Sequence, residues 1–184
     1  MGNTTQFLIL GMLSKEPMTG YDIKKTVKKT NMDSFWDISY GQIYPTLHTL
    51  EKEGAITKKV EINQNRPNRK IYSITSQGIK KLQDWLQKPA EPEKVKIETL
   101  LKVGFGEQTT KNEVIKHLKE FKKRCNSRLE NAIAFENEIK NRPNQTERGF
   151  YTLLTVLLGK NFEKAGIDWA DTAIKLLNEH IEQK

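Results

Sequence analysis

Polar and aromatic side chains gather on one predicted helix between residues 39 and 53. The set combines hydroxyl, phenol and amide groups: Ser39, Tyr40, Gln42, Tyr44, Thr46 and Thr49. Side chains of these types bond base edges in a DNA major groove, and Gln pairs with adenine through both its oxygen and its nitrogen. Tyr44 has an alternative role, because the helical wheel places it beside the buried stripe, where it would pack against Tyr21. The spacing predicts a helix face that contacts bases.

Cations and amides lie on a predicted hairpin and on the helix before it. The hairpin contains Asn65, Arg66, Asn68, Arg69 and Lys70, and the earlier helix adds Lys24, Lys25, Lys28 and Lys29. Arg and Lys at the edge of an interface neutralise phosphates and hold a protein in register on the duplex. Taken singly, an exposed polar helix face or an Asn-Pro turn is more often only solvated surface. The two sets together favour a polyanionic partner.

Basic charge is concentrated in the first half of the chain. Residues 1–88 contain 14 Lys and Arg against 8 Asp and Glu, a net charge of +6, whereas residues 89–184 contain 17 against 15, a net charge of +2. A basic domain suits nucleic acid or an anionic membrane surface. The apolar stretch over 7–13 is too short for a membrane helix or a signal segment. We therefore expect a cytoplasmic protein without a membrane partner.

Three helices are predicted before the hairpin, over residues 4–15, 19–29 and 39–53. The second carries the lysines and the third carries the polar and aromatic set. The second and third begin at capping-box patterns, in which a hydroxyl residue is followed three positions later by an acid or an amide. Pro45 leaves the start of the third helix uncertain by one turn, because proline is tolerated only in the first turn or at a kink. The connection before that helix is expected to be pinned to the core by Phe35, Trp36 and Ile38.

A hairpin and a fourth helix follow. Residues 55–75 alternate with a period of two around a polar tip, which predicts a β-hairpin. An amphipathic helix begins after Thr75, and Pro89–Pro92 reads as a linker. Three helices, a hairpin and a helix form the order of a winged helix-turn-helix, whose third helix enters the major groove while the hairpin, or wing, lies beside it. We predict this domain over residues 1–88.

The second half is predicted to be all helical. A linker and a short helix occupy residues 89–109, a long helix runs from the capping box at Thr110 to Pro143, and two further helices follow, the second carrying Trp169. Apolar residues on the long helix recur at spacings of three and four over about three heptads, which is at the threshold for coiled-coil pairing. We predict a helical dimerisation domain over residues 110–184 and a mainly α fold class with a small β-hairpin.

Residue patterns for catalysis or metal binding do not stand out. His48, His117 and His180 are far apart in sequence. Cys125 falls on the apolar stripe of the long helix, where a buried structural thiol is expected. The sequence contains no phosphate-binding glycine loop and no Ser, His and Asp grouping. We expect no enzyme activity, no cofactor and no metal.

Four separated motifs resemble the PadR family of transcriptional regulators, in its larger subfamily with a long C-terminal helical domain. The motifs are ILGMLS at 9–14, PMTGY at 17–21, GQIYPTL at 41–47 with LE and EG at 50–54, and RKIYSIT at 69–75 with Gly78. An Ile-Tyr-Pro inside a helix makes the resemblance specific, because helical propensity disfavours it. The resemblance is close over residues 7–86 and looser over residues 159–177. Many relatives carry Pro in place of Tyr40, so contacts at the start of that helix are expected to differ.

This resemblance implies a sequence-specific DNA-binding regulator, a repressor that is released by a small aromatic or lipophilic effector. It also implies a homodimer whose C-terminal helices interlock. We predict that this dimer binds an inverted repeat of double-stranded DNA. Trp36, Trp85 and Trp169 are candidates for an effector pocket between the two parts of the chain, although such residues are more often plain core. The alternative is a winged-helix protein-interaction module without direct DNA binding, which the basic wing disfavours.

Overall fold

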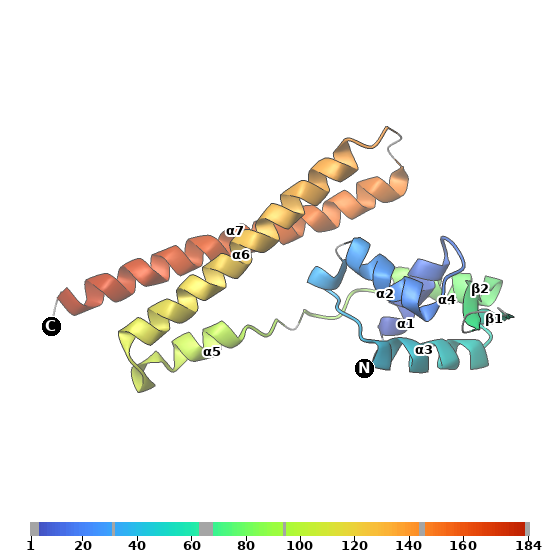
Figure 1. The fold of residues 1–184 in the computed structure, drawn as a ribbon, viewed down its shortest axis with the longest axis horizontal. Coiled ribbons are helices and arrows are strands. Elements are labelled where there is room, and N and C mark those ends of the chain that lie inside the picture. Colours follow the sequence, from blue (N-terminus) through green and yellow to red (C-terminus); the bar gives the residue numbers. More distant parts are fainter. Residues whose placement is uncertain (1–3, 31, 63–67, 94, 144–145, 183–184) are drawn as a thin grey trace. The chain divides into compact units, whose positions relative to one another are not determined.

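The structure is a computed structural model that describes residues 4–30, 32–62, 68–93, 95–143 and 146–182. The chain divides into two compact units, Met1–Pro92 and Glu93–Lys184 (Figure 1). The first unit combines helices with one antiparallel hairpin, and the second is helical. The predicted mainly α class with a small β-hairpin is confirmed. Within the described ranges, no helix is both long and apolar enough to cross a membrane.

The N-terminal unit has the predicted order of elements. They are α1 (Thr5–Leu13), α2 (Gly20–Lys29), the 3-10 turn η1 (Met32–Ser34), α3 (Tyr40–Lys52), β1 (Ile56–Glu61), β2 (Arg69–Ile74) and α4 (Ser76–Leu86). α1 is the central helix, since it packs against α2, α3, α4 and β2. This arrangement leaves one side of α3 available to solvent.

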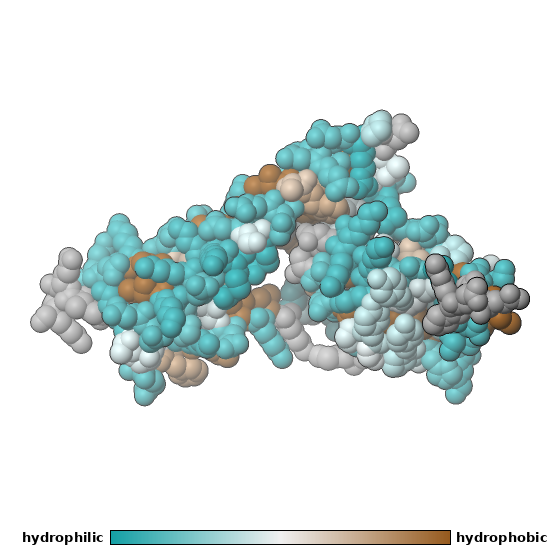
Figure 2. All heavy atoms as spheres, viewed as in Figure 1, coloured by the Kyte–Doolittle hydropathy of each residue, from teal (hydrophilic) through white to brown (hydrophobic). Residues whose placement is uncertain are grey.

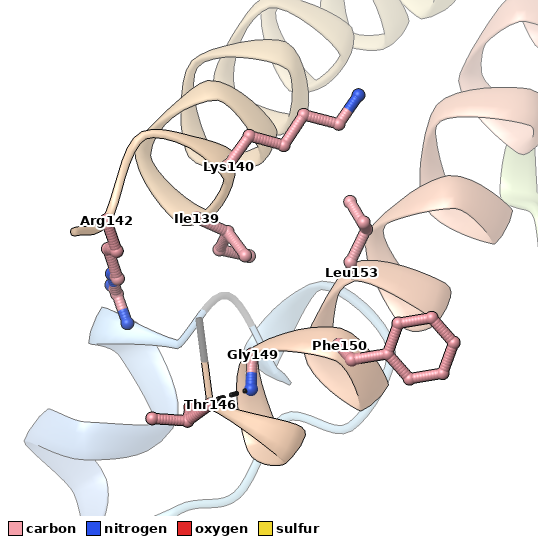
Figure 3. A pocket seen from close by; sticks show the side chains of 7 residues that line it. All are labelled: Ile139, Lys140, Arg142, Thr146, Gly149, Phe150 and Leu153. Carbon is pink, nitrogen blue, oxygen red and sulfur yellow. Dashed lines mark hydrogen bonds between the residues drawn. The ribbon is translucent and has the colours of Figure 1, made fainter. Parts of the chain in front are cut away.

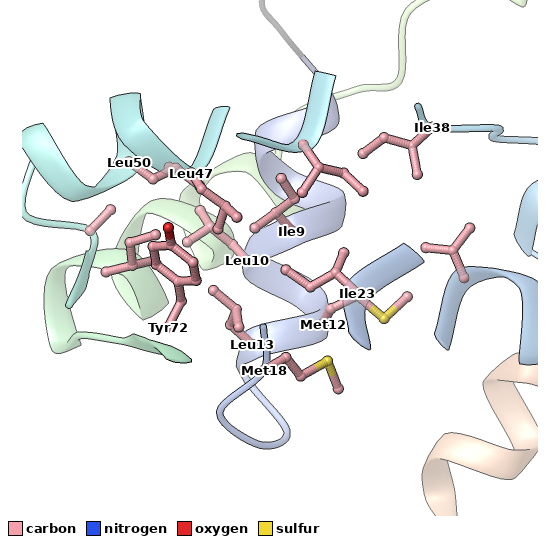
Figure 4. Packing of buried hydrophobic residues seen from close by; sticks show 14 residues of the cluster. Ile9, Leu10, Met12, Leu13, Met18, Ile23, Ile38, Leu47, Leu50 and Tyr72 are labelled. Atoms are coloured by element: carbon pink, nitrogen blue, oxygen red, sulfur yellow. The ribbon is translucent and has the colours of Figure 1, made fainter. Parts of the chain in front are cut away.

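A single apolar core holds these elements together (Figure 4). Its buried members come from every helix except α4 and from both strands: Ile9, Leu10, Met12, Leu13, Met18, Ile23, Val27, Ile38, Ile43, Leu47, Leu50, Ala55, Ile56 and Tyr72. Burying one large apolar side chain stabilises a fold by roughly 1.5–3 kcal/mol. The N-terminal unit therefore contains its own source of stability.

Only one of the three predicted anchors between α2 and α3 reaches this core. Ile38 is fully buried, whereas Phe35 and Trp36 are exposed. The prediction for these two aromatic residues is wrong. Both follow η1, where their backbone N–H groups donate to the Met32 carbonyl, and the Met32 side chain packs against the core in their place.

The hairpin contacts the segment before α2 and the start of α4. Met18 and Tyr72 exchange two backbone hydrogen bonds of 3.0 and 2.9 Å, which adds a short bridge to β2. Gly54, with φ of +71°, lies in the turn between α3 and β1. Gly78 lies so close to the hairpin that an added Cβ would stand 2.1 Å from the Ala55 carbonyl oxygen. Only glycine fits at that position.

Hydroxyl residues cap helices where the sequence predicts them. Thr19 and Asp22 form a complete capping box at α2, and Thr75 accepts from the Gly78 N–H at α4. α3 begins at Tyr40, so Pro45 lies in its second turn, beyond the positions where a missing N–H has no consequence. Pro45 has no N–H and therefore cannot make the usual helical bond to the Gly41 carbonyl.

The C-terminal unit is a long antiparallel helix pair preceded by a short helix (Figure 1). Its elements are α5 (Glu98–Gly104), the 3-10 turn η2 (Gly106–Gln108), α6 (Lys111–Lys140) and α7 (Glu147–Glu182). The prediction of two separate helices after Pro143 is wrong, because α7 is continuous. Gly159 disfavours a helix by only about 1 kcal/mol, and packing along α6 supports the chain on both sides of it.

Small apolar clusters and ion pairs alternate along the contact between α6 and α7. One cluster contains Phe121, Cys125 and Ala170, and another contains Ala132, Ile139 and Val156. Between and beside them, Lys122 binds Asp171, Arg128 binds Glu163 through two nitrogens, and Glu136 accepts from Lys140 and Lys160. Ion pairs therefore contribute to the register of the two helices.

Two titratable groups in this contact have shifted pKa values. Hydrogen bonds from Lys140 and Lys160 lower the pKa of the nearly buried Glu136 carboxyl to about 2. Burial, with a smaller contribution from Glu163, raises the pKa of the Cys125 thiol to about 11. The thiol is fully buried and neutral near pH 7, as expected for a structural cysteine.

Large apolar side chains of α5, its C-cap residue Phe105 and α7 reach the surface. They include Leu100, Leu101, Phe105, Phe150, Leu154, Leu157, Leu158 and Phe162. Figure 2 shows hydrophobic patches between hydrophilic side chains on this unit. Phe150, Leu154, Leu157 and Leu158 are each more than a third exposed. α6 alone is too narrow to cover the apolar stripe of α7.

Candidate nucleic-acid interface

The outer face of α3 presents most of the side chains predicted to contact bases. Ile43, Leu47 and Leu50 point into the core, which turns Tyr40, Gln42, Tyr44 and Thr49 toward solvent. Ser39 is exposed at the start of the helix. We call these five exposed residues the α3 face.

Thr46 does not belong to the α3 face. Its side chain is only 4% exposed, and its hydroxyl donates to the Gln42 carbonyl oxygen at 2.7 Å. The prediction that Thr46 points outward is wrong. At 100° per residue, Thr46 lies only about 40° from the buried Leu50 around the helix axis, and therefore shares its side.

Tyr44 covers the start of α2. A Cβ added at Gly20 would stand 2.7 Å from Cε1 of Tyr44, so the ring occupies the space that the glycine leaves free. Tyr44 also stacks on Tyr40, with ring centroids 6.2 Å apart. Both rings are about half exposed. Gly20 thus lets α2 and α3 approach closely while two phenol groups stay at the surface.

Gln42 is part of the cap of α3. Its Oε1 accepts from the backbone N–H of Ser39 at 3.0 Å and from the Ser39 hydroxyl at 3.2 Å. The predicted pairing of Ser39 with Gln42 is therefore present. The side chain is exposed at the same time, so Gln42 can both hold the first turn and meet a ligand.

The wing places two cations and an amide at the start of β2. Asn68, Arg69 and Lys70 are exposed, whereas Asn65 and Arg66 lie outside the described residues. Arg69 stands 3.5 Å from the Asp22 carboxylate on α2. A hydrogen bond from the Thr19 hydroxyl, with a smaller contribution from Arg69, lowers the pKa of Asp22. Asp22 thus links the cap of α2 to the base of the wing.

The four lysines of α2 that were predicted to contact phosphates differ in their surroundings. Lys24 is only 16% exposed and binds Asp37 at 2.7 Å, while Lys25, Lys28 and Lys29 are exposed on α2. Two further cations, for which the sequence pattern gives no signal, bind acids at the end of α3: Lys58 pairs with Glu51, and Lys81 pairs with Glu53. Lys25 and Lys28 are therefore better placed for phosphates than Lys24.

The three tryptophan side chains have different surroundings. Trp36 is 39% exposed, Trp85 stacks on Phe7 with centroids 4.6 Å apart, and Trp169 meets Phe121 edge to face. Trp36 and Trp85 belong to the first unit and Trp169 to the second. Their use in one effector pocket stays a prediction.

A hollow of about 30 Å³ lies where α6 ends and α7 begins (Figure 3). Its walls come from both helices and the turn between them: Ile139, Lys140, Arg142, Thr146, Gly149, Phe150 and Leu153. Drug-sized ligands occupy pockets of about 300–1,000 Å³, so this hollow is too small for an aromatic effector.

Family models match both units of the chain. Residues 9–84 match the transcriptional regulator PadR-like family, and residues 95–178 match virulence activator alpha C-term. The first match contains the α3 face, Arg69 and Lys70. The second contains α5, α6 and most of α7.

Individual relatives match nearly the full length. The chain is 28% identical over 180 residues to the negative transcriptional regulator PadR of Bacillus subtilis strain 168, covering 95% of this chain and 97% of that protein. The crystal structure of B. subtilis PadR in complex with operator DNA gives a TM-score of 0.85 at 26% identity, covering 96% of this chain and 99% of that one. B. subtilis PadR in complex with p-coumaric acid gives 0.77 at 25% identity, with the same coverage. The chain belongs to the PadR-like family of transcriptional regulators.

Proposed function

We propose that this protein is a sequence-specific DNA-binding repressor of transcription. The α3 face carries the proposal, because it is an exposed polar and aromatic surface in a chain that matches a relative solved with operator DNA. In a winged helix-turn-helix, the corresponding helix enters the major groove and the wing lies beside it. A DNA partner supports a location in the cytoplasm, which is part of this proposal.

Roles within this surface follow from its chemistry. Tyr40, Gln42, Tyr44 and Thr49 contact base edges, and Asn68, Arg69 and Lys70 hold the backbone from the wing. Lys25 and Lys28 add phosphate contacts from α2. The charge of the first half of the chain, +6, supports this assignment. Ser39 has mainly a capping role, and Thr46 supports the helix from inside.

The proposed active form is a homodimer on an inverted repeat. Residues 110–184 supply the dimer contact, since α7 exposes more large apolar side chains than a solvated helix requires. A twofold dimer presents two copies of α3 about 34 Å apart, which matches one turn of DNA. Sedimentation that gives only monomer at micromolar concentration would overturn this part of the proposal.

Selection of bound fragments from random DNA tests the proposal most directly. We expect two inverted half-sites whose centres are about one helical turn apart. Gel shifts at rising salt then distinguish DNA binding from a protein-interaction role. Each neutralised phosphate adds about 0.9 to the salt slope, so affinity should fall steeply. Failure to retain any duplex at low salt would favour the protein-interaction module.

The proposed effector is a small aromatic or lipophilic molecule. The support is that B. subtilis PadR has been solved with p-coumaric acid. Among the three tryptophans, Trp36 is the best placed, because its ring is partly exposed and the other two pack against phenylalanines. Titration with p-coumaric acid should release DNA and quench tryptophan fluorescence, and Trp36→Phe should reduce the quenching. Retention of DNA at saturating acid would exclude this ligand.

A further inference from the structure

Gln42 has no acceptor left for a base. A side-chain amide oxygen accepts two hydrogen bonds. Oε1 of Gln42 already takes one from the Ser39 backbone N–H at 3.0 Å and one from the Ser39 hydroxyl at 3.2 Å. Both lone pairs therefore point into the cap of α3 and away from a ligand in front of the helix.

The other end of the same amide is a donor only. The Ser39 N–H is a fixed donor, so it determines which end of the amide is oxygen and leaves the Nε2 hydrogens on the opposite side. Across the described part of the chain, no residue takes a hydrogen bond from Nε2, and the side chain is exposed. Gln42 thus presents two N–H groups to whatever meets the α3 face.

Base edges in the major groove differ in how they match such a group. Adenine offers one acceptor, N7, beside a donor, and its usual pairing with Gln requires the amide oxygen. Guanine offers two neighbouring acceptors, N7 and O6, and thymine offers one with a methyl group beside it. A donor-only amide is therefore best matched by guanine.

We infer that Gln42, with its oxygen held by Ser39, selects guanine in each half-site. The inference rests on the proposed DNA binding and specifies the base that one residue reads. The cap would have to open before adenine could be bound in the usual way. Opening would leave the Ser39 N–H, one of the unpaired donors of the first turn, without its partner. The cap therefore sets the specificity of the residue that forms it.

Gln42→Glu separates the cap from base contact. A carboxylate accepts the same two bonds from Ser39, so helix content and thermal midpoint should stay near those of the unchanged protein. It has no donor, and its free oxygen accepts from the cytosine amino group. Gln42→Ala removes both functions. Gln83→Glu, on the exposed side of α4, controls for the change in charge.

Random-DNA selection on the full-length protein and these three variants tests the inference. We expect guanine at one position of each half-site, cytosine there with Gln42→Glu, and loss of roughly tenfold discrimination there with Gln42→Ala. Gln83→Glu should keep guanine. Adenine or any other base at the position that Gln42→Ala relaxes would overturn the inference, as would an unchanged preference. If the unchanged protein selects no sequence, the proposed function itself fails.

Discussion

The two units of this chain bury apolar surface in different ways. The N-terminal unit encloses one core with side chains from three helices and both strands. In the C-terminal unit, α6 and α7 share small clusters separated by ion pairs, and large side chains such as Leu154 and Leu158 remain outside. One unit is complete as a folded body, and the other has apolar surface without a cover.

This difference indicates where each unit obtains its stability. A closed core gains free energy from burial within one chain, roughly in proportion to the apolar area removed from water. An open apolar stripe gains that free energy only when a second surface covers it. The proposed dimer supplies this second surface, so mutations should affect the N-terminal unit through folding and the C-terminal unit through association.

The largest effect is expected from truncation inside the closed core. Leu10→Ala should destabilise the protein by about 3 kcal/mol, because it leaves a cavity where the side chain is fully buried. Urea unfolding followed by circular dichroism measures the change. Leu86→Ala, at an exposed position of α4, is the matched control and should change little. A Leu10→Ala variant as stable as its control would show that the N-terminal core is not the main source of stability.

A charge on the open stripe should weaken association. Leu158 is 73% exposed, so Leu158→Glu should leave helix content unchanged while raising the dimer dissociation constant at least about tenfold, equivalent to about 1.4 kcal/mol. Sedimentation equilibrium over a dilution series gives this constant. Leu86→Glu, in the other unit, should not change it. Equal self-association of both variants would place the dimer contact elsewhere.

Removing the buried acid of the helix pair should change the response to pH. The folded-state pKa of Glu136 is about 2, below its ordinary value of 4.5, so its contribution to stability is complete above pH 4.5 and lost toward pH 2. Glu136→Gln should lower the thermal midpoint at pH 7 and reduce its decline between those two pH values. Glu138→Gln, whose pair with Arg142 is exposed, serves as control. A decline as steep as in the unchanged protein would contradict a role for Glu136.

The smallest effect is expected on the wing. Arg69→Ala should weaken binding to all DNA sequences alike and reduce the salt slope by about 0.9. Gel shifts at several salt concentrations measure the slope. Lys81→Ala is a useful comparison because Lys81 already binds Glu53. A change in sequence preference, with the slope unchanged, would mean that Arg69 contacts bases.

Local signals account for the parts of the fold that the sequence predicts well. The starts of α2, α3 and α6 follow from hydroxyl residues three positions before an acid or amide, which is a short-range contact. The sequence after Pro143 carries no comparable signal for one continuous helix. Gly159 lies in the middle of it, and a single glycine weakens a helix without ending it. Continuity of α7 depends on α6, which lies beside it only after folding.

The candidate site likewise contains some features that local sequence signals predict and others that they do not. Exposure of Tyr40, Gln42 and Thr49 follows from the buried stripe of α3, whereas the pair between Arg69 and Asp22 joins residues 47 positions apart and has no local signal. One ion pair between α6 and α7 did leave a signal. Arg128 interrupts the apolar stripe of α6 and binds Glu163 of α7. Charged residues on a predicted inner stripe thus indicate interhelical partners.

An unbroken α7 also limits how the second unit can deform. Its 36 residues, at about 1.5 Å of rise each, extend about 54 Å. A continuous helix of this length acts as a stiff rod, since its backbone hydrogen bonds leave no hinge. Small shifts at one end would therefore be carried to the other end. The length of α7 exceeds one helical turn of DNA, which is about 34 Å.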